Sequence, residues 1–552
     1  MKIHYQPQLL TSAQAIVKCI KIEEIPNVFC VPGESYLPVM DAIFDEPSIE
    51  LISTRHEGGA AFMAEGFAKA SGKPAVVLAT RGVGGANLAI GVHTAYQDST
   101  PMVVFLGQVH SQFKGREGFQ EVDLERFFGP ISKWTVEIQE PSRVPELVQR
   151  AFRISQTGRP GPVVISLPED LLSKKAEMVF TRAAVKPAPS PSLREVHEIE
   201  QRLQEAERPV VIAGGGVKNS GAEEELIKFA TTFSLPVLSA FRRHDVFPNN
   251  HPLYAGHLGL GGNPNIVNTI QEADTVVAIG TRLSEVTTQD YSLLGRDQTL
   301  VHIDIDYETL GKVYPPDVGV VSDAKEALQR LASIHAPTKW TAWSKARRQA
   351  YVDSTLAIKG KETTNQKMIS ILQNRLPAGT ILTNDAGNFA GWLHTFFQFN
   401  QKNTYIGPTS GAMGYGMPAA LGVKIAQPNR TVVSLSGDGG FMMTMQELET
   451  AVRYSIPVIS IVFNNGMYGT IRMHQEIHFP YKKIGTDLGH VPFSKMAKEL
   501  GAIGFYVETP KEFEQALTKA IYAEKPVVIE VESDPEQISV ASTIQQIRDR
   551  SN

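Results

Sequence analysis

Short runs of apolar and β-branched residues alternate along the first third of the chain with stretches rich in small residues at helical spacing. These runs predict five buried strands, at Val28–Val31, Glu50–Thr54, Ala75–Ala79, Met102–Gly107 and Val163–Leu167. Strands that are apolar on both faces and are separated by helices are typical of a parallel sheet covered by helices. We therefore expect residues 1–183 to form one α/β domain.

A proline-rich segment, Lys186–Ser192, interrupts this pattern, and its three alternating prolines cannot continue a helix or a central strand. We interpret it as a linker to a second α/β region, residues 193–336. That region is expected to contain strands at Pro209–Gly216, Thr275–Gly280 and Leu300–Asp306 and a helix near 323–333. A second break at Ala336–Lys339 precedes a third α/β region, residues 362–535.

The predicted fold class is thus α/β, with three doubly wound parallel-sheet domains. The length of 552 residues agrees with this division, because a chain of that size is too long for a single hydrophobic core and divides into about three domains of ordinary size.

The composition is that of an ordinary soluble protein, with 42% hydrophobic residues, 20% charged residues and a formal net charge of -5. A slightly negative chain has no electrostatic reason to bind nucleic acid. Only Cys19 and Cys30 are present, which favours a reducing compartment. The N-terminus lacks a basic stretch followed by an apolar run, and no segment approaches a membrane span of roughly 18 apolar residues. We expect a cytoplasmic protein with no membrane and no nucleic-acid partner.

Candidate chemistry is concentrated in the third region. The β-branched run Thr431–Ser436 ends in Gly437-Asp438-Gly439-Gly440, and a second strand, Val458–Phe463, ends in Asn464-Asn465, with a predicted helix at Thr444–Tyr454 between them. In a parallel βαβ unit both motifs lie at the carboxyl ends of neighbouring strands, where open α/β sheets bind ligands. An Asp carboxylate and an Asn amide oxygen suit Mg²⁺, and the glycines allow a diphosphate to approach the backbone.

This pair of motifs resembles the fingerprint of the thiamine diphosphate (ThDP) enzymes. The resemblance implies an N-terminal pyrimidine-binding domain, a central domain and a C-terminal diphosphate- and Mg²⁺-binding domain. It implies that Asp438, Asn465 and the carbonyl of Met467 hold the metal, and that Gly437, Gly439, Gly440 and Asn388 lie by the diphosphate. Asn388 belongs to Asp385-Ala386-Gly387-Asn388, which follows a strand predicted at Gly379–Thr383.

Glu57 is the predicted activating carboxylate. A bound ThDP becomes a nucleophile once a carboxylate hydrogen-bonds its pyrimidine ring, and Glu57 stands between a predicted strand and an Ala- and Gly-rich helix that permits close packing on a flat ring. The alternative is a helix N-terminal Glu stabilised by the macrodipole. Arg55-His56-Glu57 resembles the corresponding motif of acetolactate synthases (acetohydroxyacid synthase large subunits) and related decarboxylases.

The likeness to acetolactate synthases extends along most of the chain. It covers Val28–Gly33 with Pro32 and Gly33 in a cofactor loop, Gly84–Leu88 with Asn87, the segments at Gln108 and Phe119–Asp123, and Gly411–Pro418. The resemblance implies that the carbonyl of Gly411 accepts from the cofactor's amino group and that Met413 wedges the cofactor into a bent shape. It also implies a homodimer or homotetramer, with each active site between the N-terminal domain of one subunit and the C-terminal domain of another.

Two positions depart from the acetolactate synthase pattern. Glu34 stands where these enzymes usually have a glycine, and it is either a second catalytic acid/base or a solvated loop residue. His474 stands where biosynthetic relatives have a tryptophan, so acceptor preference does not carry over. The resemblance also leaves open an FAD in the central domain near Arg159, although Gly214-Gly215-Gly216 is not the usual dinucleotide fingerprint.

The predicted activity is ThDP- and Mg²⁺-dependent decarboxylation of a 2-oxo acid such as pyruvate, followed by carboligation of the enamine to a second carbonyl compound. Glu57 would activate the cofactor, while Gln108 and Glu34 would handle protons. A decarboxylase or 2-hydroxy-ketone lyase that releases an aldehyde is the alternative within the enzyme class. From a different class, the chain would be a catalytically silent regulatory relative.

Overall fold

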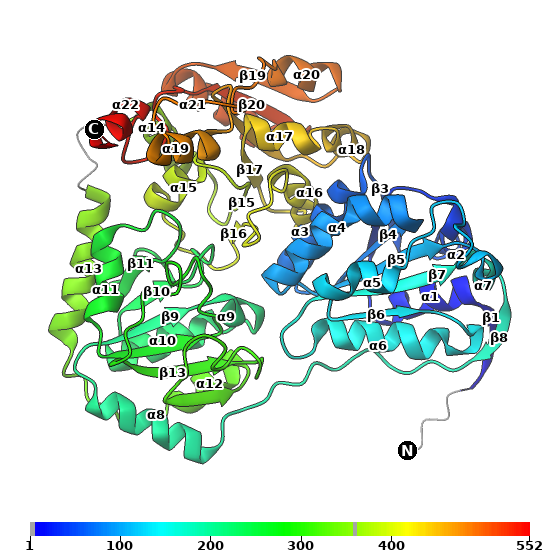
Figure 1. Ribbon diagram of the computed structural model, residues 1–552, viewed down its shortest axis with the longest axis horizontal. Coiled ribbons are helices and arrows are strands. Elements are labelled where there is room, and N and C mark those ends of the chain that lie inside the picture. The colour runs from blue at the N-terminus through cyan, green and yellow to red at the C-terminus, as the bar shows by residue number, and fades with distance from the viewer. Residues whose placement is uncertain (1–5, 357–361, 552) are drawn as a thin grey trace.

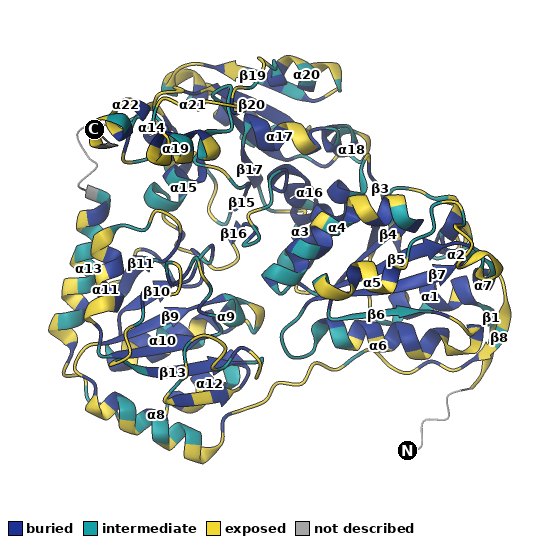
Figure 2. Cartoon of the chain, viewed as in Figure 1, coloured by how far each residue is buried: buried dark blue, intermediate teal, exposed yellow. Residues whose placement is uncertain are grey.

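The computed structural model describes residues 6–356 and 362–551 and contains three α/β domains, each built on a sheet of six parallel strands (Figure 1). The N-terminal domain is blue to cyan, the central domain green and the C-terminal domain yellow to red. The predicted fold class is confirmed. In Figure 2 the sheets are almost entirely buried, with exposed residues on the outer faces of the helices.

The N-terminal sheet has the strand order β3-β2-β4-β5-β7-β6. Its strands are β2 (Asn27–Cys30), β3 (Glu50–Ser53), β4 (Ala75–Thr80), β5 (Met102–Gln108), β6 (Trp134–Glu137) and β7 (Pro162–Pro168). Its main helices are α1 (Ser12–Ile22), α2 (Leu37–Phe44), α3 (Glu57–Ser71), α4 (Arg81–Asp98), α5 (Leu124–Phe128) and α6 (Val144–Gln156). All five predicted strands are confirmed. Strand β6 was not predicted, because it lies at the sheet edge and is only partly buried.

The central sheet has the order β11-β10-β9-β12-β13-β14, which is the 3-2-1-4-5-6 order of dinucleotide-binding sheets when its strands are numbered along the chain. These strands are β9 (Pro209–Ala213), β10 (Val237–Ser239), β11 (Tyr254–His257), β12 (Thr275–Ile279), β13 (Thr299–Asp304) and β14 (Val318–Val321). The predicted strands correspond to β9, β12 and β13, and the predicted helix to α12 (Ala324–Leu331). Helix α13 (Thr341–Leu356) lies beyond the expected domain end at 336, yet its Tyr351 packs edge-to-face against Tyr254 of β11.

The C-terminal sheet has the order β16-β15-β17-β18-β20-β19. Its strands are β15 (Ile381–Asn384), β16 (Tyr405–Ile406), β17 (Val432–Gly437), β18 (Ile459–Asn464), β19 (Ile503–Val507) and β20 (Val527–Glu532). Numbered along each chain segment, the N- and C-terminal sheets share the order 2-1-3-4-6-5. The helix predicted at Thr444–Tyr454 corresponds to α18 (Glu447–Arg453), whereas a separate helix before it, α17 (Asp438–Thr444), was not predicted.

Helix α3 of the N-terminal domain and α16 (Gly416–Ala426) of the C-terminal domain lie side by side at the centre of the molecule (Figure 1). Glycines make this contact close. A Cβ at Gly422 would lie 1.8 Å from the carbonyl oxygen of Met63, and a Cβ at Gly66 would lie 2.3 Å from that of Ala419. Because no larger residue fits at either position, these glycines fix how the two domains pack.

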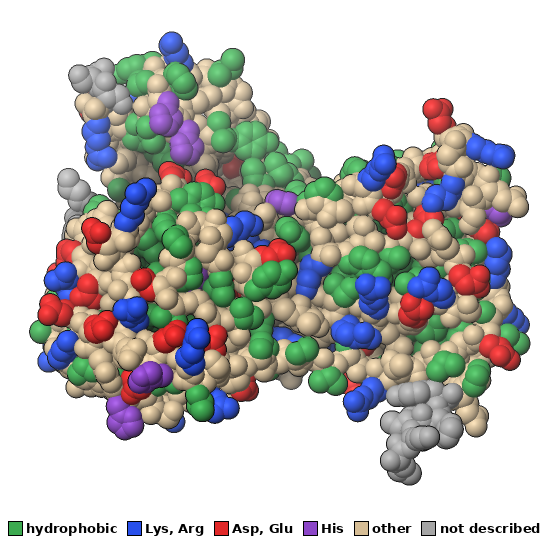
Figure 3. Space-filling model, turned by 60° about the horizontal axis from the view of Figure 1, so that its bottom comes forward, with side chains coloured by type: hydrophobic (Ala, Val, Ile, Leu, Met, Phe, Trp, Pro, Cys, Tyr) green, Lys and Arg blue, Asp and Glu red, His purple; other side chains and the backbone are tan. Residues whose placement is uncertain are grey.

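Residues 179–192 form no helix or strand and connect the N-terminal and central domains, as expected for a linker. Cys19 and Cys30 are both buried and free. Within the described part of the chain, every helix is too short or too polar to cross a bilayer. On the face shown in Figure 3, acidic and basic side chains are interspersed.

Candidate active site

The structure brings the two glycine- and asparagine-containing motifs of the third region together. Strands β17 and β18 are parallel neighbours, so Asp438 and Asn465 follow their carboxyl ends side by side. The Oδ2 atom of Asp438 accepts a hydrogen bond of 2.8 Å from the amide of Gly466, and Oδ1 accepts one of 2.9 Å from the amide of Gly439. The amide of Met467 donates to Asn465 Oδ1 at 3.3 Å.

Two glycines after Asp438 lie so close to neighbouring atoms that no side chain fits at these positions. A Cβ at Gly439 would lie 2.6 Å from the Tyr468 ring, and a Cβ at Gly440 would lie 2.9 Å from Asp385 Oδ2. Gly437 is the N-cap of α17 and has no side chain that would occupy the helix N-terminus. Of the backbone amides at this end, that of Gly439 already donates to Asp438 Oδ1, and the others belong to a helix N-terminus, a type of site that favours anions.

Asp438 is a buried carboxylate, with 6% of the residue exposed. Burial raises its pKa above the usual value, and the amides of Gly439 and Gly466 oppose that rise. No three His, Cys, Asp or Glu side chains within residues 6–356 and 362–551 form a metal cluster. The predicted set of one carboxylate, one amide oxygen and one backbone carbonyl consists instead of hard oxygen donors, which suit Mg²⁺.

The loop before α16 is tied to the turn after β15. Asp385 is buried, and its Oδ1 accepts hydrogen bonds from the backbone amides of Tyr415 and Gly416. Burial raises the pKa of Asp385 to about 6. Gly411 is exposed, has φ +71° and opens the stretch that carries the half-buried Met413. Its left-handed backbone explains why a glycine stands at this position.

Asn388 joins two neighbouring segments of the C-terminal domain. Its Nδ2 donates to the carbonyl of Ile538 at 2.9 Å, and its Oδ1 accepts from the hydroxyl of Thr470 at 2.8 Å. Thr470 belongs to α19 (Gly469–His478), which begins two residues after Met467. The side chain thus braces the segment that carries the predicted metal-binding carbonyl, and its contact with a diphosphate stays a prediction.

Glu57 is the first residue of α3, and the N-cap His56 accepts from the amide of Gly58 at 3.0 Å. The Glu57 carboxylate is half-buried and accepts a hydrogen bond of 3.0 Å from Asn87 Nδ2. A Cβ at Gly84 would lie 3.2 Å from Glu57 Oε1. Asn87 and Gly84, both on α4, therefore orient the predicted activating carboxylate.

A buried glutamate that we did not predict fixes the turn in front of Glu57. Glu447, the first residue of α18, accepts hydrogen bonds of 2.9 to 3.2 Å from the amides of Arg55 and His56. A Cβ at Gly59 would lie 2.5 Å from Glu447 Oε1. Burial raises the pKa of Glu447. No local pattern identifies this contact, because its two sides are almost 400 residues apart.

Glu34 lies in the loop after β2 and Gln108 is the last residue of β5, and the surroundings of the two side chains differ. The side chain of Glu34 is 76% exposed, and its Oε1 lies 3.7 Å from Nη1 of Arg81. Gln108 is 1% exposed; its Nε2 donates to the carbonyl of Val122 at 2.9 Å and its Oε1 accepts from the amide of Val109. Both ends of the Gln108 amide are thus engaged within the chain.

Pro32 and Gly33 precede Glu34 on the same loop. Pro32 is exposed, and Gly33 is half-buried, with room for no larger residue because a Cβ there would lie 2.7 Å from Cβ of Thr80. The sequence therefore places this loop tightly against the end of β4.

The two halves of the predicted site lie at the edges of two different sheets. Across the described residues, no hydrogen bond or ion pair joins Glu57 to Asp438 or Asn465, and the hydrogen bond of Glu57 goes to Asn87. What the structure provides is two separate constellations, one at the carboxyl edge of each outer sheet.

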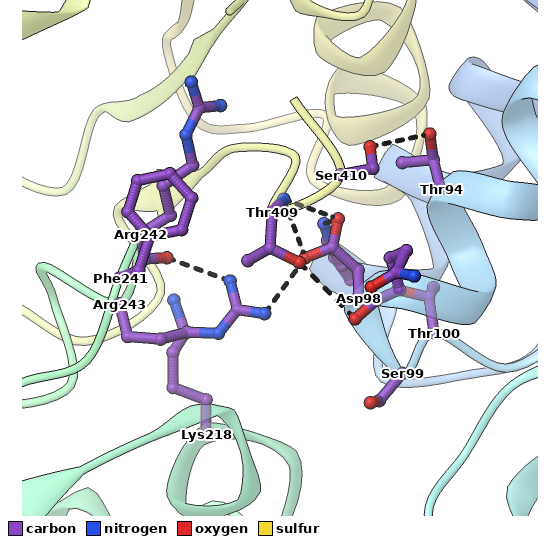
Figure 4. Close-up of polar contacts among 12 residues, drawn as sticks. Thr94, Asp98, Ser99, Thr100, Lys218, Phe241, Arg242, Arg243, Thr409 and Ser410 are labelled. Carbon is purple, nitrogen blue, oxygen red and sulfur yellow. Dashed lines mark hydrogen bonds and ion pairs between the residues drawn. The ribbon is translucent and has the colours of Figure 1, made fainter. Parts of the chain in front are cut away.

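A buried carboxylate links all three domains beside the loop that holds Thr409 and Ser410 (Figure 4). Asp98, the last residue of α4, accepts from Arg243 Nη2 of the central domain at 3.0 Å and from the amide of Thr409 at 3.0 Å. Lys69 Nζ lies 3.2 Å from its Oδ2. Burial alone would raise the pKa of Asp98, but Lys69 and Arg243 outweigh it and hold the pKa at about 2.

A pocket of about 390 Å³ lies beside this junction, at the carboxyl edge of the central sheet. Its lining includes Gly215 and Gly216 after β9 and Gly280 after β12. These are the neighbouring strands at which the strand order reverses, where such sheets bind ligands. Arg159, Arg243 and Arg282 supply positive charge to the lining.

Family models match all three domains. The N-terminal TPP binding domain of thiamine pyrophosphate enzymes matches residues 10–127, the central domain matches 196–331, and the C-terminal TPP binding domain matches 385–531.

Curated relatives match almost the whole chain. A probable acetolactate synthase large subunit of Methanocaldococcus jannaschii is 34% identical over 95% of this chain and 92% of its own. The acetolactate synthase large subunit of Lactococcus lactis is 32% identical over 94% of this chain and 92% of its own. The isozyme 3 large subunit of Escherichia coli is 30% identical over 93% and 92%, respectively.

Proposed function

The chain belongs to the thiamine pyrophosphate enzymes, among relatives of the acetolactate synthase large subunits, and on this basis we propose that it decarboxylates a 2-oxo acid and joins the remaining fragment to a second carbonyl compound. The observation that carries the proposal is the hydrogen bond of 2.8 Å between Asp438 and Gly466. It unites the two motifs at the ends of neighbouring strands.

The C-terminal edge fits a Mg²⁺–diphosphate group. Asp438, Asn465 and the carbonyl of Met467 would hold the metal, while the amides at the start of α17 and Asn388 would contact the diphosphate. Gly411 and Met413 would shape the space beside the cofactor's rings. Bound thiamine diphosphate supplies a carbon nucleophile and an electron sink for decarboxylation.

At the N-terminal edge, Glu57 would hold a proton at the pyrimidine ring, with Asn87 keeping its carboxylate in place. Glu34, mostly exposed beside Pro32 and Gly33, is the proposed acid/base for substrate protons. Gln108 would reach a substrate only after releasing the carbonyl of Val122, so we propose that it chiefly positions the Phe119–Asp123 segment.

We further propose that a second copy of the chain completes each site, as a homodimer or homotetramer. Apolar side chains are exposed on the helices next to both constellations: Val83 and Ile90 on α4, and Met442 and Met443 on α17. Apolar side chains gathered on a helix face are typical of surfaces that become buried in an assembly. Covering them with a second copy would bring the Glu57 edge of one chain to the Asp438 edge of the other.

The pocket of the central domain fits a nucleotide with phosphates, and FAD is the proposed occupant. The three arginines of the lining would face the phosphates of such a ligand, and Gly215 leaves room beside Arg243, since a Cβ there would lie 2.9 Å from Arg243 Nε. Released flavin would be detected by absorbance after denaturing the purified protein. A colourless protein that binds no added FAD would contradict this assignment.

Two free, buried thiols suit a reducing compartment, and we propose the cytoplasm as the location. Fluorescence from a tagged chain in its native host would test this, and a signal confined to the cell envelope would contradict it.

The test of the reaction is to incubate the protein with pyruvate, ThDP and Mg²⁺ and to identify the products. We expect carbon dioxide together with acetolactate or its decarboxylation product acetoin. Acetaldehyde without either product would establish the aldehyde-releasing alternative. No turnover of any 2-oxo acid, with ThDP bound, would favour a catalytically silent relative.

A further inference from the structure

A buried arginine at the start of α4 has no role in the function proposed so far. Arg81 follows β4 directly and has φ +43°, a conformation that is strained for a residue with a side chain. Only 7% of the residue is exposed. Strained residues of this kind persist where the surrounding structure holds them, often at ligand sites.

The guanidinium of Arg81 keeps unused donors after its contacts within the chain. Nη2 donates to Glu169 Oε2 at 2.7 Å and Nη1 to the carbonyl of Phe119 at 3.2 Å. Nε is buried, and no hydrogen-bond acceptor for it lies among the described residues. A buried donor without an acceptor is unfavourable, so an anion that reaches Arg81 would gain a hydrogen bond that the chain itself does not supply.

Glu34 is the weakest of the neighbours of Arg81. Its Oε1 lies 3.7 Å from Nη1, beyond hydrogen-bonding distance, and its side chain is mostly exposed. Exposed ion pairs contribute little to stability, so Glu34 can give up its place beside Nη1 of Arg81 to another carboxylate and stay next to it. The N-terminus of α4, where Thr80 makes no side-chain cap, adds partial positive charge to the same place.

We infer that Arg81 binds the carboxylate of a 2-oxo acid. The inference rests on the proposed function, which brings such an acid to this edge of the sheet. Arg81 shares α4 with Gly84 and Asn87, the residues beside Glu57, so the bound acid lies near the activating carboxylate. A guanidinium pairs with a carboxylate through two parallel N–H···O bonds, which fixes the orientation of the substrate.

The first experiment removes the positive charge of Arg81 and keeps a polar side chain of moderate length. In Arg81→Gln, the KM for pyruvate in carbon dioxide release should rise about 10- to 100-fold, as expected for loss of a charge-assisted pair. The affinity for ThDP should stay unchanged. Arg143→Gln is the matched control, because Arg143 is an exposed arginine of the same domain that pairs with Glu146.

A purely structural role of Arg81 predicts a different result. Removing the guanidinium leaves Glu169 unpaired, and the double variant Arg81→Gln/Glu169→Gln removes that defect. If Arg81 only supports the fold, the double variant regains the wild-type KM and melting temperature. If Arg81 binds substrate, the melting temperature recovers while the KM stays high.

Donor and acceptor carboxylates are separated by using acetaldehyde as a neutral acceptor. If Arg81 binds the donor, Arg81→Gln raises the KM for pyruvate even when acetoin is the product. If it binds the acceptor, that KM is unchanged and the ratio of acetolactate to acetoin falls. Either result supports the inference.

Glu34→Gln adds an independent check. Removing the competing carboxylate should lower the KM for pyruvate, while loss of the proposed proton carrier should lower kcat. Unchanged KM and product ratio in both Arg81 variants, with an active wild-type enzyme, would overturn the inference and leave the proposed function standing. A wild-type protein that turns over no 2-oxo acid would overturn both.

Discussion

The N- and C-terminal domains share one strand order, yet the carboxyl edges of their sheets are built from different groups. At the C-terminal edge, backbone amides hold Asp438 and Asn465, and the space around Gly439 and Gly440 admits no side chain. At the N-terminal edge, side chains hold one another: Asn87 contacts Glu57, and Glu34 lies near Arg81.

The two edges, although built on the same strand order, are thus suited to two different tasks: one to bind the cofactor and the other to bind substrate and transfer protons. A metal and a diphosphate need fixed oxygen and amide positions, which a backbone supplies. Proton transfer and substrate binding need charged side chains that respond to a ligand. We therefore expect substitutions at the two edges to damage different steps, and the following predictions test that division in order of decreasing effect.

Glu57→Gln should have the largest effect. We expect kcat to fall about 10²- to 10⁴-fold, as for loss of a group that manages a proton in the transition state. ThDP affinity should change little, because the C-terminal edge binds the diphosphate. Steady-state rates and a fluorescence titration with ThDP measure the two quantities. A kcat within about threefold of wild type would refute the role of Glu57.

Asp438→Ala should show the opposite pattern. Loss of the carboxylate should weaken Mg²⁺-dependent ThDP binding about 100-fold, while excess Mg²⁺ should restore much of kcat. The matched control is Asp534→Ala, since Asp534 is exposed in the same domain. If Asp438→Ala and wild type required the same Mg²⁺ concentration, the proposal that the C-terminal edge binds the metal would be contradicted.

Glu447→Ala should act on the N-terminal edge from the C-terminal domain. The partly buried amides of Arg55 and His56 would lose their acceptor, which should destabilise the fold by about 1–3 kcal/mol. Because the turn before Glu57 would loosen, kcat should fall about tenfold. Glu447→Gln keeps an acceptor and should restore both values. The melting temperature and kcat of both variants test this role of Glu447 as a hydrogen-bond acceptor. A large change of either value in Glu447→Gln would contradict it.

Lys69→Gln should have the smallest effect. It removes one partner of Asp98, the buried carboxylate that contacts all three domains. The pKa of Asp98, about 2, is below the ordinary 3.8, so its pairing stabilises the fold above about pH 4 and is lost as the pH falls towards 2. The shift corresponds to roughly 2 kcal/mol, of which Lys69 supplies part. Acid unfolding followed by circular dichroism should begin at a higher pH in the variant.

Lys73→Gln is the control for this experiment. Lys73 is nearly half exposed and lies 3.6 Å from an exposed glutamate, Glu24. Such an exposed pair contributes little to the free energy of unfolding, so the acid-unfolding curve of Lys73→Gln should match that of the wild type. Identical curves for Lys69→Gln and Lys73→Gln would show that the buried pairing of Asp98 adds no stability.

Regular patterns in the sequence predicted the parts of the fold that depend on local order. Strands buried on both faces, such as β4 and β5, were identified because their apolar residues are consecutive. Edge strands β6 and β14 were not, since they are short and only partly buried or alternate in burial. Helix α17 was not predicted, because Gly439 and Gly440 suggest a turn but lie within the helix.

The sequence alone determined the three-domain α/β architecture, the adjacency of Asp438 and Asn465, and the position of Glu57 at a helix start. These follow from the period of apolar residues and from the rule that neighbouring parallel strands end at one edge. Only the tertiary structure decided that Glu447 braces Glu57, that Asp98 joins three domains, and that Arg81 is buried with an unused donor. Such contacts join residues far apart in the chain, and their energies depend on burial and on partners that no local pattern specifies.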